Sequence, residues 1–377
     1  MTPMATPLPD IEIPHDLLPA DGRFGCGPSK VRPEAVAALA AEGGEYLGTS
    51  HRQAGVRFMV SRLRNGLAEM FALPDGYEVL LGNGGTTGLW DALTFGLIAG
   101  RSQHLSFGEF SSKFATAAAA APHLDEPEVI TAEPGTRPTA VASAEVDLYA
   151  LTHNETSTGV AMPIARPAPD GIVAVDATSA AGGMRFDPSE VDAYYFAPQK
   201  CLASDGGLWL MACSPAAIER IETIAASDRW VPASLDLGIA LENSRKDQTY
   251  NTPALATIFL AVQQIEWVNQ HGGLEWAASR CDRSSGTLYA WAEASAYATP
   301  YVADPADRSR VVATIDLDDA IDATTVSKVL RANGIVDTES YRKLGRNQLR
   351  IATFPAIEPD DVEALTRCID HVAAALG

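Results

Sequence analysis

Short apolar runs alternate with helix-like stretches from about residue 23 to about residue 215. Residues 77–81, 146–152, 172–175 and 207–211 are apolar along most of their length, not only at every second position. Such runs are typical of strands buried on both faces of a parallel sheet. Between the first two, Leu89, Leu93 and Leu97 recur every four residues, which predicts a helix. The alternation of strands and helices predicts an α/β domain with a mainly parallel sheet.

The pattern changes near residue 260. A long helix is expected at 261–269, continuing past Gly272-Gly273 to about residue 296. The C-terminal stretch then predicts a strand, a helix, a strand and a helix, at 311–317, 324–333, 348–353 and 360–376. With the proline-rich start of the chain, this predicts three parts: an N-terminal arm at 1–22, a large domain at 23–260 and a smaller C-terminal α/β domain at 261–377.

The charge balance narrows the classes of partner. The 377 residues include 28 Lys and Arg against 48 Asp and Glu, which gives a formal net charge of −20. Nucleic acid and anionic membranes are therefore poor general partners, because they are negative themselves. An acidic protein can still bind a small anion, but it then needs a local cluster of cations.

The cysteines and the N-terminal residues indicate the cellular compartment of the protein. The five cysteines are odd in number and none forms a C-x-x-C pair, so neither a disulfide framework nor a metal site is expected. Residues 1–23 have no basic start and no apolar run, unlike a signal peptide. No apolar stretch is long enough to span a bilayer. The expected compartment is the cytoplasm.

The strongest chemical signal is Asp176 followed 24 positions later by Lys200. Pyridoxal 5'-phosphate (PLP) needs a lysine that binds it as a Schiff base and later moves a proton. It also needs an acid that keeps its pyridine nitrogen protonated. Asp176 ends a predicted buried strand, where ligands bind in open α/β sheets. Taken singly, Lys200 would more often be a surface lysine, and Asp176 a turn residue.

Two further features could bind anions. The glycine-rich stretch 82–88 precedes the predicted helix, and its backbone N–H groups, with Thr86 and Thr87, suit a phosphate. It matches neither the P-loop pattern nor G-x-G-x-x-G, and such a turn is more often a plain strand-to-helix connection. His51-Arg52 and the distant Arg350 offer cations to carboxylate or phosphate groups, although most single arginines are surface residues.

Several segments, taken in chain order, carry a family resemblance. They are Phe24-Gly25-Cys26-Gly27-Pro28-Ser29, Ser50-His51-Arg52, Gly84-Gly85-Thr86-Thr87, Asn154-Glu155-Thr156, Asp176, Gln199-Lys200, Tyr250-Asn251-Thr252-Pro253 and Leu349-Arg350-Ile351. This series resembles the phosphoserine aminotransferases, which are class-V PLP enzymes of fold type I. The matches span nearly the whole chain. The resemblance implies a fold-type-I transferase with a large domain that has a mainly parallel sheet and a smaller C-terminal α/β domain.

The resemblance also implies a role for each matching residue. Lys200 would hold the cofactor, Asp176 would pair with its pyridine nitrogen, and Phe110 would stack on its ring. Thr156 and Gln199 would contact its ring or phosphate, and Thr86 and Thr87 its phosphate. Asn251 and Thr252 would reach the cofactor phosphate of the neighbouring subunit, which requires a homodimer with shared sites. His51, Arg52 and Arg350 would bind the substrate anions, and no metal takes part.

The sequence also departs from the family pattern. Phe110 stands where tryptophan is common, and threonines stand near Gly84-Gly85 where many members have an arginine. The loop after Lys200 also differs. These changes leave the cofactor chemistry in place and affect the residues available to bind the substrate phosphate.

The resemblance implies transfer of the amino group of L-glutamate to 3-phosphohydroxypyruvate. This gives O-phospho-L-serine and 2-oxoglutarate in serine biosynthesis, and 4-phosphohydroxy-L-threonine of pyridoxine biosynthesis is a possible second product. We assign Arg350 to the α-carboxylate, and His51 and Arg52 to the distal anion, with Arg342, Lys343 and Arg346 as alternatives. Other readings are another class-V enzyme, such as an alanine–glyoxylate-type aminotransferase or a cysteine desulfurase, or a non-enzymatic scaffold. Lys200 and Asp176 together disfavour a scaffold, which needs neither residue.

Overall fold

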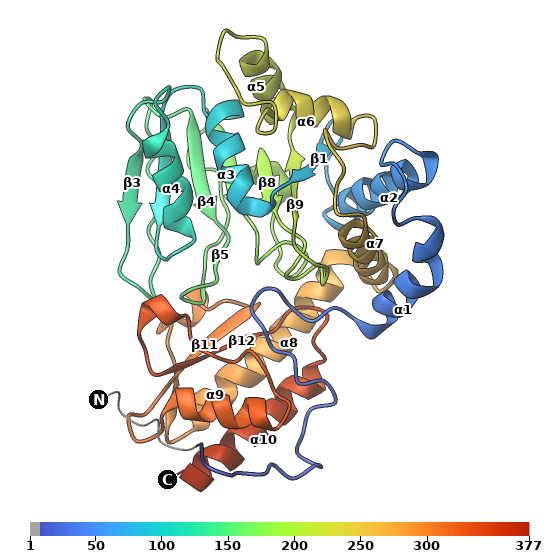
Figure 1. Ribbon diagram of the computed structural model, residues 1–377. Helices are drawn as coiled ribbons and strands as arrows, with labels where there is room; N and C mark the ends of the chain where they lie inside the picture. The colour runs from blue at the N-terminus through green and yellow to red at the C-terminus, as the bar shows by residue number, and fades with distance from the viewer. Residues whose placement is uncertain (1–7, 377) are drawn as a thin grey trace, which may run out of the picture.

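The computed structural model describes residues 8–376, in an upper part built on a large sheet and a lower part built on a small one (Figure 1). The large sheet has the strand order β1-β9-β8-β7-β4-β2-β3. Its strands are β1 (Glu78–Asn83), β2 (Ser102–Ser106), β3 (Glu128–Thr131), β4 (Leu148–Thr152), β7 (Ile172–Asp176), β8 (Ala193–Phe196) and β9 (Leu208–Cys213). Only the pairs β8–β9 and β1–β9 are antiparallel. The predicted mainly parallel α/β sheet is therefore confirmed.

The large sheet is buried on both faces, as its apolar runs predict. Along β7, Ile172 and Ala174 pack into one apolar cluster, whereas Val173 and Val175 pack into the other. The first cluster lies under α3 (Gly85–Gly96), α4 (Ser111–Ala120), α5 (Pro215–Ala225) and α6 (Leu237–Ser244). The second cluster includes α2 (Ala54–Met70) and α7 (Leu255–Gln270), beside which α1 (Pro33–Glu42) packs. A two-stranded ribbon, β5 (Asn154–Glu155) and β6 (Val160–Ala161), follows β4.

The long helix expected after residue 260 is two helices. The first, α7, ends at Gln270, and α8 (Gly273–Ala294) begins after a break at Gly272. Gly272 and Gly273 have φ angles of 118° and 68°, which lie outside the right-handed helical region. The expectation of one helix through the glycine pair was therefore wrong, because both glycines adopt a conformation that ends a helix.

The lower part combines a small antiparallel sheet with three helices. Its strand order is β10-β11-β12. The elements are α8, β10 (Ala298–Pro300), β11 (Val312–Leu317), α9 (Ala323–Ala332), β12 (Gln348–Ala352) and α10 (Pro359–Leu376). The strands and helices predicted for this stretch are present within one or two residues, and β10 is an addition. The predicted domain boundaries themselves stay a prediction.

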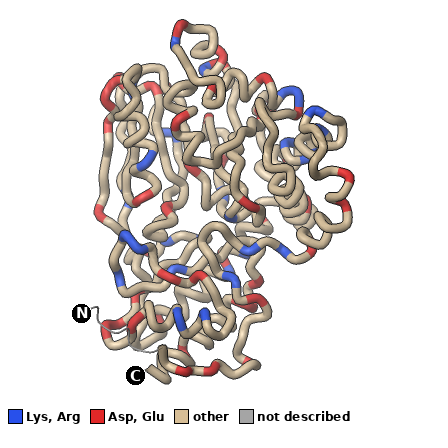
Figure 2. The backbone as a smooth tube through the Cα atoms, viewed as in Figure 1, with Lys and Arg blue, Asp and Glu red and all other residues tan. Residues whose placement is uncertain are grey.

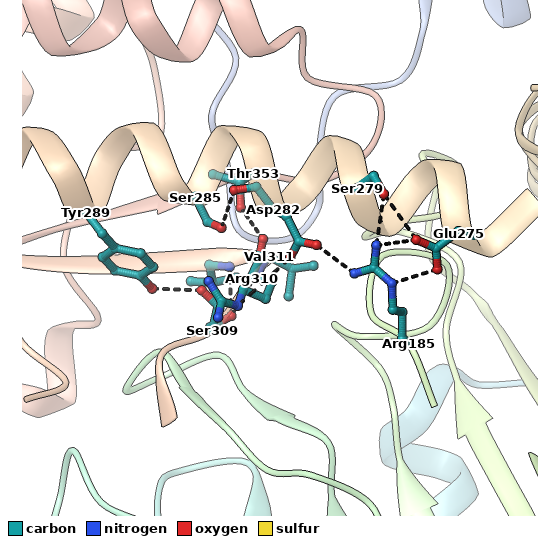
Figure 3. Close-up of polar contacts among 11 residues, drawn as sticks. Arg185, Glu275, Ser279, Asp282, Ser285, Tyr289, Ser309, Arg310, Val311 and Thr353 are labelled. Atoms are coloured by element: carbon teal, nitrogen blue, oxygen red, sulfur yellow. Dashed lines mark hydrogen bonds and ion pairs between the residues drawn. The ribbon is translucent and has the colours of Figure 1, made fainter. Parts of the chain in front are cut away.

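Helix α8 joins the two parts through polar contacts (Figure 3). Arg185, in the loop after β7, donates to Glu275 at 2.7 Å and to Asp282 at 2.6 Å, both on α8. On the other side, the Tyr289 hydroxyl of α8 donates to the carbonyl of Ser309 at 2.8 Å, just before β11. These contacts fix the lower part against the loops at the carboxyl ends of the large-sheet strands.

Residues 8–22 run along the lower part before the chain enters the upper part (Figure 1). The backbone N–H of Ala20 donates to Asp361 at 2.8 Å, and the N–H of Ile13 donates to Asn333 at 2.9 Å. The first seven residues of the predicted arm lie outside the described range. Within residues 8–376, no helix is both long enough and apolar enough to cross a membrane.

Candidate active site

A cavity of 460 Å³ opens at the carboxyl ends of β4, β7 and β8, between the upper and lower parts. Its volume is in the range of small-molecule and cofactor sites. Lys and Arg segments lie in the zone where the two parts meet (Figure 2). The predicted site residues that line the cavity form what we call the inner group: Thr86, Thr87, Phe110, Thr156, Asp176, Gln199, Lys200 and Arg350.

Lys200 follows β8 after a short turn and is buried at the floor of the cavity. Its Nζ donates a hydrogen bond to the Thr156 hydroxyl at 2.9 Å. Burial lowers the pKa of Lys200, because the charged amine is poorly solvated there, although Asp176 partly offsets this effect. A Cβ on Gly27 would lie 2.8 Å from the Lys200 Cε, so only glycine leaves room for the lysine stem. The site thus favours the neutral, reactive form of the amine more than water does.

Asp176 ends β7 and lines the cavity together with Lys200. One carboxylate oxygen accepts from the Trp90 indole N–H at 3.2 Å, and the other accepts from the backbone N–H of Thr178 at 2.9 Å. Burial raises the pKa of Asp176, whereas the bonds from Thr178 and the charge of Lys200 lower it. A cationic ring nitrogen placed beside this carboxylate would favour its ionised form.

A buried hydrogen-bond network orients the amine and the arginine. The Thr156 hydroxyl donates to Ser179 at 2.9 Å, and the Asn154 amide donates to Ser179 at 2.8 Å. The Arg350 guanidinium reaches across from β12 and donates to the carbonyl of Thr156 at 3.3 Å. Thr156 therefore links Lys200 on the large sheet to Arg350 on the small one.

Phe110 is positioned by a buried carboxylate. Glu155 accepts from the backbone N–H groups of Phe110 and Ser111 at 3.0 and 2.8 Å, where α4 begins. A carboxylate at a helix N-terminus is stabilised by the helix dipole. The Phe110 ring centroid then lies 5.3 Å from the Lys200 Nζ, so the ring can cover a planar ligand attached to that lysine.

The glycine-rich turn opens α3 as predicted. Gly84 and Gly85 have φ angles of 113° and 65°, which let the backbone turn directly from β1 into the helix. The N–H of Gly84 donates to the carbonyl of Gly207 at 3.0 Å, and the hydroxyls of Thr86 and Thr178 share a hydrogen bond of 2.8 Å. The free N–H groups of the first helical turn line the cavity and suit an anion.

The inner group fits PLP. Three buried polar atoms of cavity residues have no partner within residues 8–376: Asn154 Oδ1, Gln199 Oε1 and Arg350 Nε. Buried polar atoms normally have partners, so these three indicate a polar ligand. Lys200 would bind the aldehyde, Asp176 would face the ring nitrogen, Phe110 would cover the ring and the start of α3 would take the phosphate. This group of residues supplies what a cofactor-borne electron sink requires.

Four predicted site residues do not line this cavity. His51, Arg52, Asn251 and Thr252, which we call the outer group, lie beside one another at the surface. Thr252 Oγ1 lies 3.2 Å from His51 Nδ1, and Asn251 bonds to Asn83 at the end of β1. Arg52 donates to Gln248 at 3.3 Å. Within one chain, His51 and Arg52 therefore do not frame a pocket together with Arg350, contrary to the expectation.

The alternative cations for the distal anion lie in the loop before β12. Lys343 forms an ion pair with Glu109, and Arg346 forms one with Asp316. Arg342 is exposed and has no ion pair within residues 8–376. None of the three lines the cavity.

Sequence reasoning missed several residues that line the cavity. Trp90 lies one helical turn after Thr86, a spacing that could have revealed it. Tyr341 lies with its ring centroid 5.7 Å from that of Phe110 and 5.3 Å from the Arg350 guanidinium carbon. Cys26 lies in a segment that carries the family resemblance, but no role was assigned to it. Lys113 carried no local signal, since only the fold brings it to the cavity.

Comparisons with known proteins agree with this geometry. The model of the family "Aminotransferase class-V" matches residues 24–338. A phosphoserine aminotransferase of a Nocardioides species is 62% identical over 366 residues, which cover 96% of this chain and 98% of that protein.

Solved structures show the same fold. The phosphoserine aminotransferase of Cytophaga hutchinsonii has a TM-score of 0.86 at 24% identity and covers 92% of this chain and 97% of its own. A PLP-bound phosphoserine aminotransferase of Trichomonas vaginalis has a TM-score of 0.79 at 18% identity, over 93% and 99% of the two chains. The fold-type-I architecture is therefore confirmed, and the chain belongs to the class-V aminotransferase family.

Proposed function

We propose that this chain is a PLP-dependent aminotransferase that moves the amino group of L-glutamate to 3-phosphohydroxypyruvate. The products are O-phospho-L-serine and 2-oxoglutarate, a step of serine biosynthesis. The observation that carries the proposal is the convergence of the buried Lys200 amine, the buried Asp176 carboxylate and Arg350 on one cavity. The relative from Nocardioides, whose length the chain matches almost fully, supports the choice of substrates.

Each residue of the inner group then has a task. When bound, PLP supplies an electron sink for the bonds at the amino acid's Cα. Lys200 Nζ, with its lowered pKa, accepts the Cα proton and returns a proton when the keto acid is aminated. Arg350 pairs with the α-carboxylate, and its unpartnered Nε provides a second donor toward that group. Phe110 shields one side of the site from water.

We further propose that the enzyme acts as a homodimer in which the outer group completes the partner's site. Within residues 8–376, His51 and Arg52 form no ion pair, and like Asn251 and Thr252 they lie outside the cavity. In a twofold dimer, the same patch of each subunit would face the other subunit's cavity. There His51 and Arg52 would meet the distal carboxylate or phosphate of the substrate, and Asn251 and Thr252 the cofactor phosphate.

The alternative functions agree less well with the residues of the cavity. A cysteine desulfurase needs a mobile, reactive cysteine, but Cys201 is buried, bonded to the carbonyl of Ser179, and has its pKa raised by burial. Cys26 lines the cavity, yet its pKa is raised by burial as well. An alanine–glyoxylate-type enzyme would not need cations for a distal anion. Formation of 4-phosphohydroxy-L-threonine stays a prediction.

The compartment follows from the same proposal. All five cysteines are free and buried, as suits a protein of a reducing compartment. We therefore place the enzyme in the cytoplasm, with amino and keto acids as its partners.

A half-reaction screen tests the proposed function. The purified, PLP-loaded protein is mixed with one amino acid at a time, and the absorption of the bound cofactor is followed. L-glutamate and O-phospho-L-serine should change the spectrum fastest, and L-alanine much more slowly, because alanine has no distal anion. Fastest reaction with L-alanine would favour the alanine–glyoxylate-type alternative, and no reaction with any amino acid would refute an aminotransferase.

A further inference from the structure

The cavity has a third cation that the mechanism does not use. Lys113 lines it together with Lys200 and Arg350. Lys200 is bonded to the Thr156 hydroxyl and Arg350 to the Thr156 carbonyl. The Lys113 ammonium group, in contrast, makes no hydrogen bond or ion pair with any residue in the described range 8–376. A half-buried cation that faces a cavity without a counter-ion indicates an anionic ligand.

The position of Lys113 indicates which side of the cavity it serves. It lies in the first turn of α4, and its Nζ is 5.0 Å from the Phe110 ring centroid and 6.0 Å from that of Trp90. Trp90 follows Thr86 by four residues on α3, so both lie on the same face of that helix. Helical side chains lean toward the helix N-terminus. The ammonium group therefore lies at the start of α4, beside the Phe110 and Trp90 rings and next to α3.

That side of the cavity needs a positive charge. Residues 82–88 contain no Lys or Arg, so the start of α3 offers only N–H groups, hydroxyls and about half a unit charge from the helix dipole. Asp205 lines the same cavity and adds a negative charge. A phosphate monoester carries close to two negative charges at neutral pH. Lys113 is the cavity-lining cation placed to offset them.

We infer that Lys113 binds the phosphate group of the cofactor, in addition to the N-terminal turn of α3. This inference rests on the proposed function, because it takes PLP as the bound group. The competing explanation is that Lys113 only packs over the two aromatic rings of Phe110 and Trp90. Packing alone would not distinguish a phosphorylated ligand from the same ligand without its phosphate.

The test compares PLP with pyridoxal, which has the same ring and aldehyde but no phosphate. Cofactor-free wild type, Lys113→Met and Lys113→Arg are titrated with each ligand, and dissociation constants are read from absorbance and protein fluorescence. Lys328→Met is the matched control, because Lys328 is exposed on α9 and lies outside the cavity. Urea midpoints of the free proteins show that each variant is folded.

Lys113→Met should weaken PLP binding by about tenfold or more, and pyridoxal binding by no more than about twofold. Lys113→Arg should restore most of the PLP affinity, and Lys328→Met should match the wild type. Added KCl should weaken PLP binding more steeply in the wild type than in Lys113→Met. Inorganic phosphate, as a separate probe, should raise the melting temperature of the free wild type more than that of Lys113→Met.

Two results separate the possible failures. If Lys113→Met lost PLP and pyridoxal equally, or kept full PLP affinity, Lys113 would be a packing residue and this inference would be wrong. If it kept PLP affinity but lost O-phospho-L-serine selectively, Lys113 would bind the substrate's distal anion, which also overturns the inference. A wild type that bound no PLP would instead refute the proposed function.

Discussion

The inner and outer groups differ in their burial and in the contacts that their residues make within one chain. The inner group lies on the carboxyl ends of large-sheet strands, on the start of α3 and on β12, and its key side chains are buried and bonded to one another. The outer group lies at the surface, on the loop before α2 and the turn before α7. Three of its four residues are exposed, and its contacts are mainly within the group or to neighbouring amides.

This difference separates cofactor chemistry from substrate choice. The covalent and proton-transfer groups are fixed by the fold of a single chain, where burial can shift their pKa values. The cations for a distal anion are left exposed, where they can serve a neighbouring subunit. Substitutions in the inner group, and those of Asn251 and Thr252, should therefore affect every substrate. Substitutions of His51 and Arg52 should affect only substrates with an anionic side chain.

The largest effect should come from Lys200→Ala. The variant should fold and can still hold PLP non-covalently, but both the covalent link and the proton carrier are gone. We expect turnover of glutamate and phosphoserine to fall by about three orders of magnitude or more, measured by the half-reaction in a stopped-flow instrument. Near-normal turnover in this variant would contradict the role assigned to Lys200.

Asp176→Asn should come next. It leaves the shape of the site but removes the negative charge beside the ring nitrogen, and losing one partner of a buried charge pair costs about 3–5 kcal/mol. PLP affinity should therefore fall by about two to three orders of magnitude, read by equilibrium dialysis. Asp360→Asn is the matched control, since the side chain of Asp360 is 83% exposed on α10. Full PLP affinity in Asp176→Asn would make Asp176 a turn residue.

Substitutions of Arg350 and Arg52 should distinguish binding of all amino acids from selectivity for those with an anionic side chain. Arg350→Ala should lower kcat/KM for all amino acids alike, because all carry an α-carboxylate. Arg52→Ala should lower it by about one to two orders of magnitude for phosphoserine and glutamate, and far less for alanine. Arg367→Ala, on the exposed face of α10, is the control. Equal losses for alanine and phosphoserine in Arg52→Ala would direct the search to Arg342, Lys343 and Arg346.

A smaller effect concerns how the free energy of unfolding of the cofactor-free protein depends on pH. It should distinguish the inner region from the outer group. Burial lowers the pKa of His153, beneath the inner group, to about 4, whereas an unfolded histidine titrates near 6.5. Below pH 6.5 the unfolded state binds a proton that the folded state does not bind until about pH 4. His153 therefore reduces stability as the pH falls through this window, by up to about 1.4 kcal/mol per pH unit.

Urea midpoints at pH 7, 6 and 5 measure this effect. His153→Gln should flatten the decline, and His51→Gln, in the outer group and only partly buried, should change it much less. An unchanged decline in His153→Gln would assign the acid sensitivity to other groups, such as the buried His104.

Much of the fold was predictable, because apolar periodicity reports burial directly. The run at 172–175 became β7 within a residue, since strands buried on both faces contain few polar positions. The stretch 348–353, in which polar and apolar residues largely alternate, became β12 within a residue as well. The helix break at Gly272-Gly273 was not predicted, because apolar periodicity continues through it while backbone conformation does not. The ribbon β5–β6 and strand β10 are too short to give a pattern.

The site was predictable where chemistry is tied to a strand end, as for Asp176 and Lys200. Tyr341 has a role that depends on neighbours far away in the sequence, so no local pattern indicates it. Trp90 was missed although its spacing from Thr86 places both on one face of the predicted helix. Lys113 resembles any lysine of an amphipathic helix until α3 and α4 are packed together. The separation of the outer group from Arg350 is likewise a property of the folded chain and not of any motif.

The proposal that the two groups meet across a dimer is tested most directly by subunit mixing. Lys200→Ala subunits are mixed with subunits that carry both Asn251→Ala and Thr252→Ala, each nearly inactive alone. In a shared-site dimer, every mixed dimer has one intact site, so equal mixing should restore about a quarter of the wild-type sites. Activity that stays at the level of the separate variants after verified exchange, or a fully active monomer, would contradict the account.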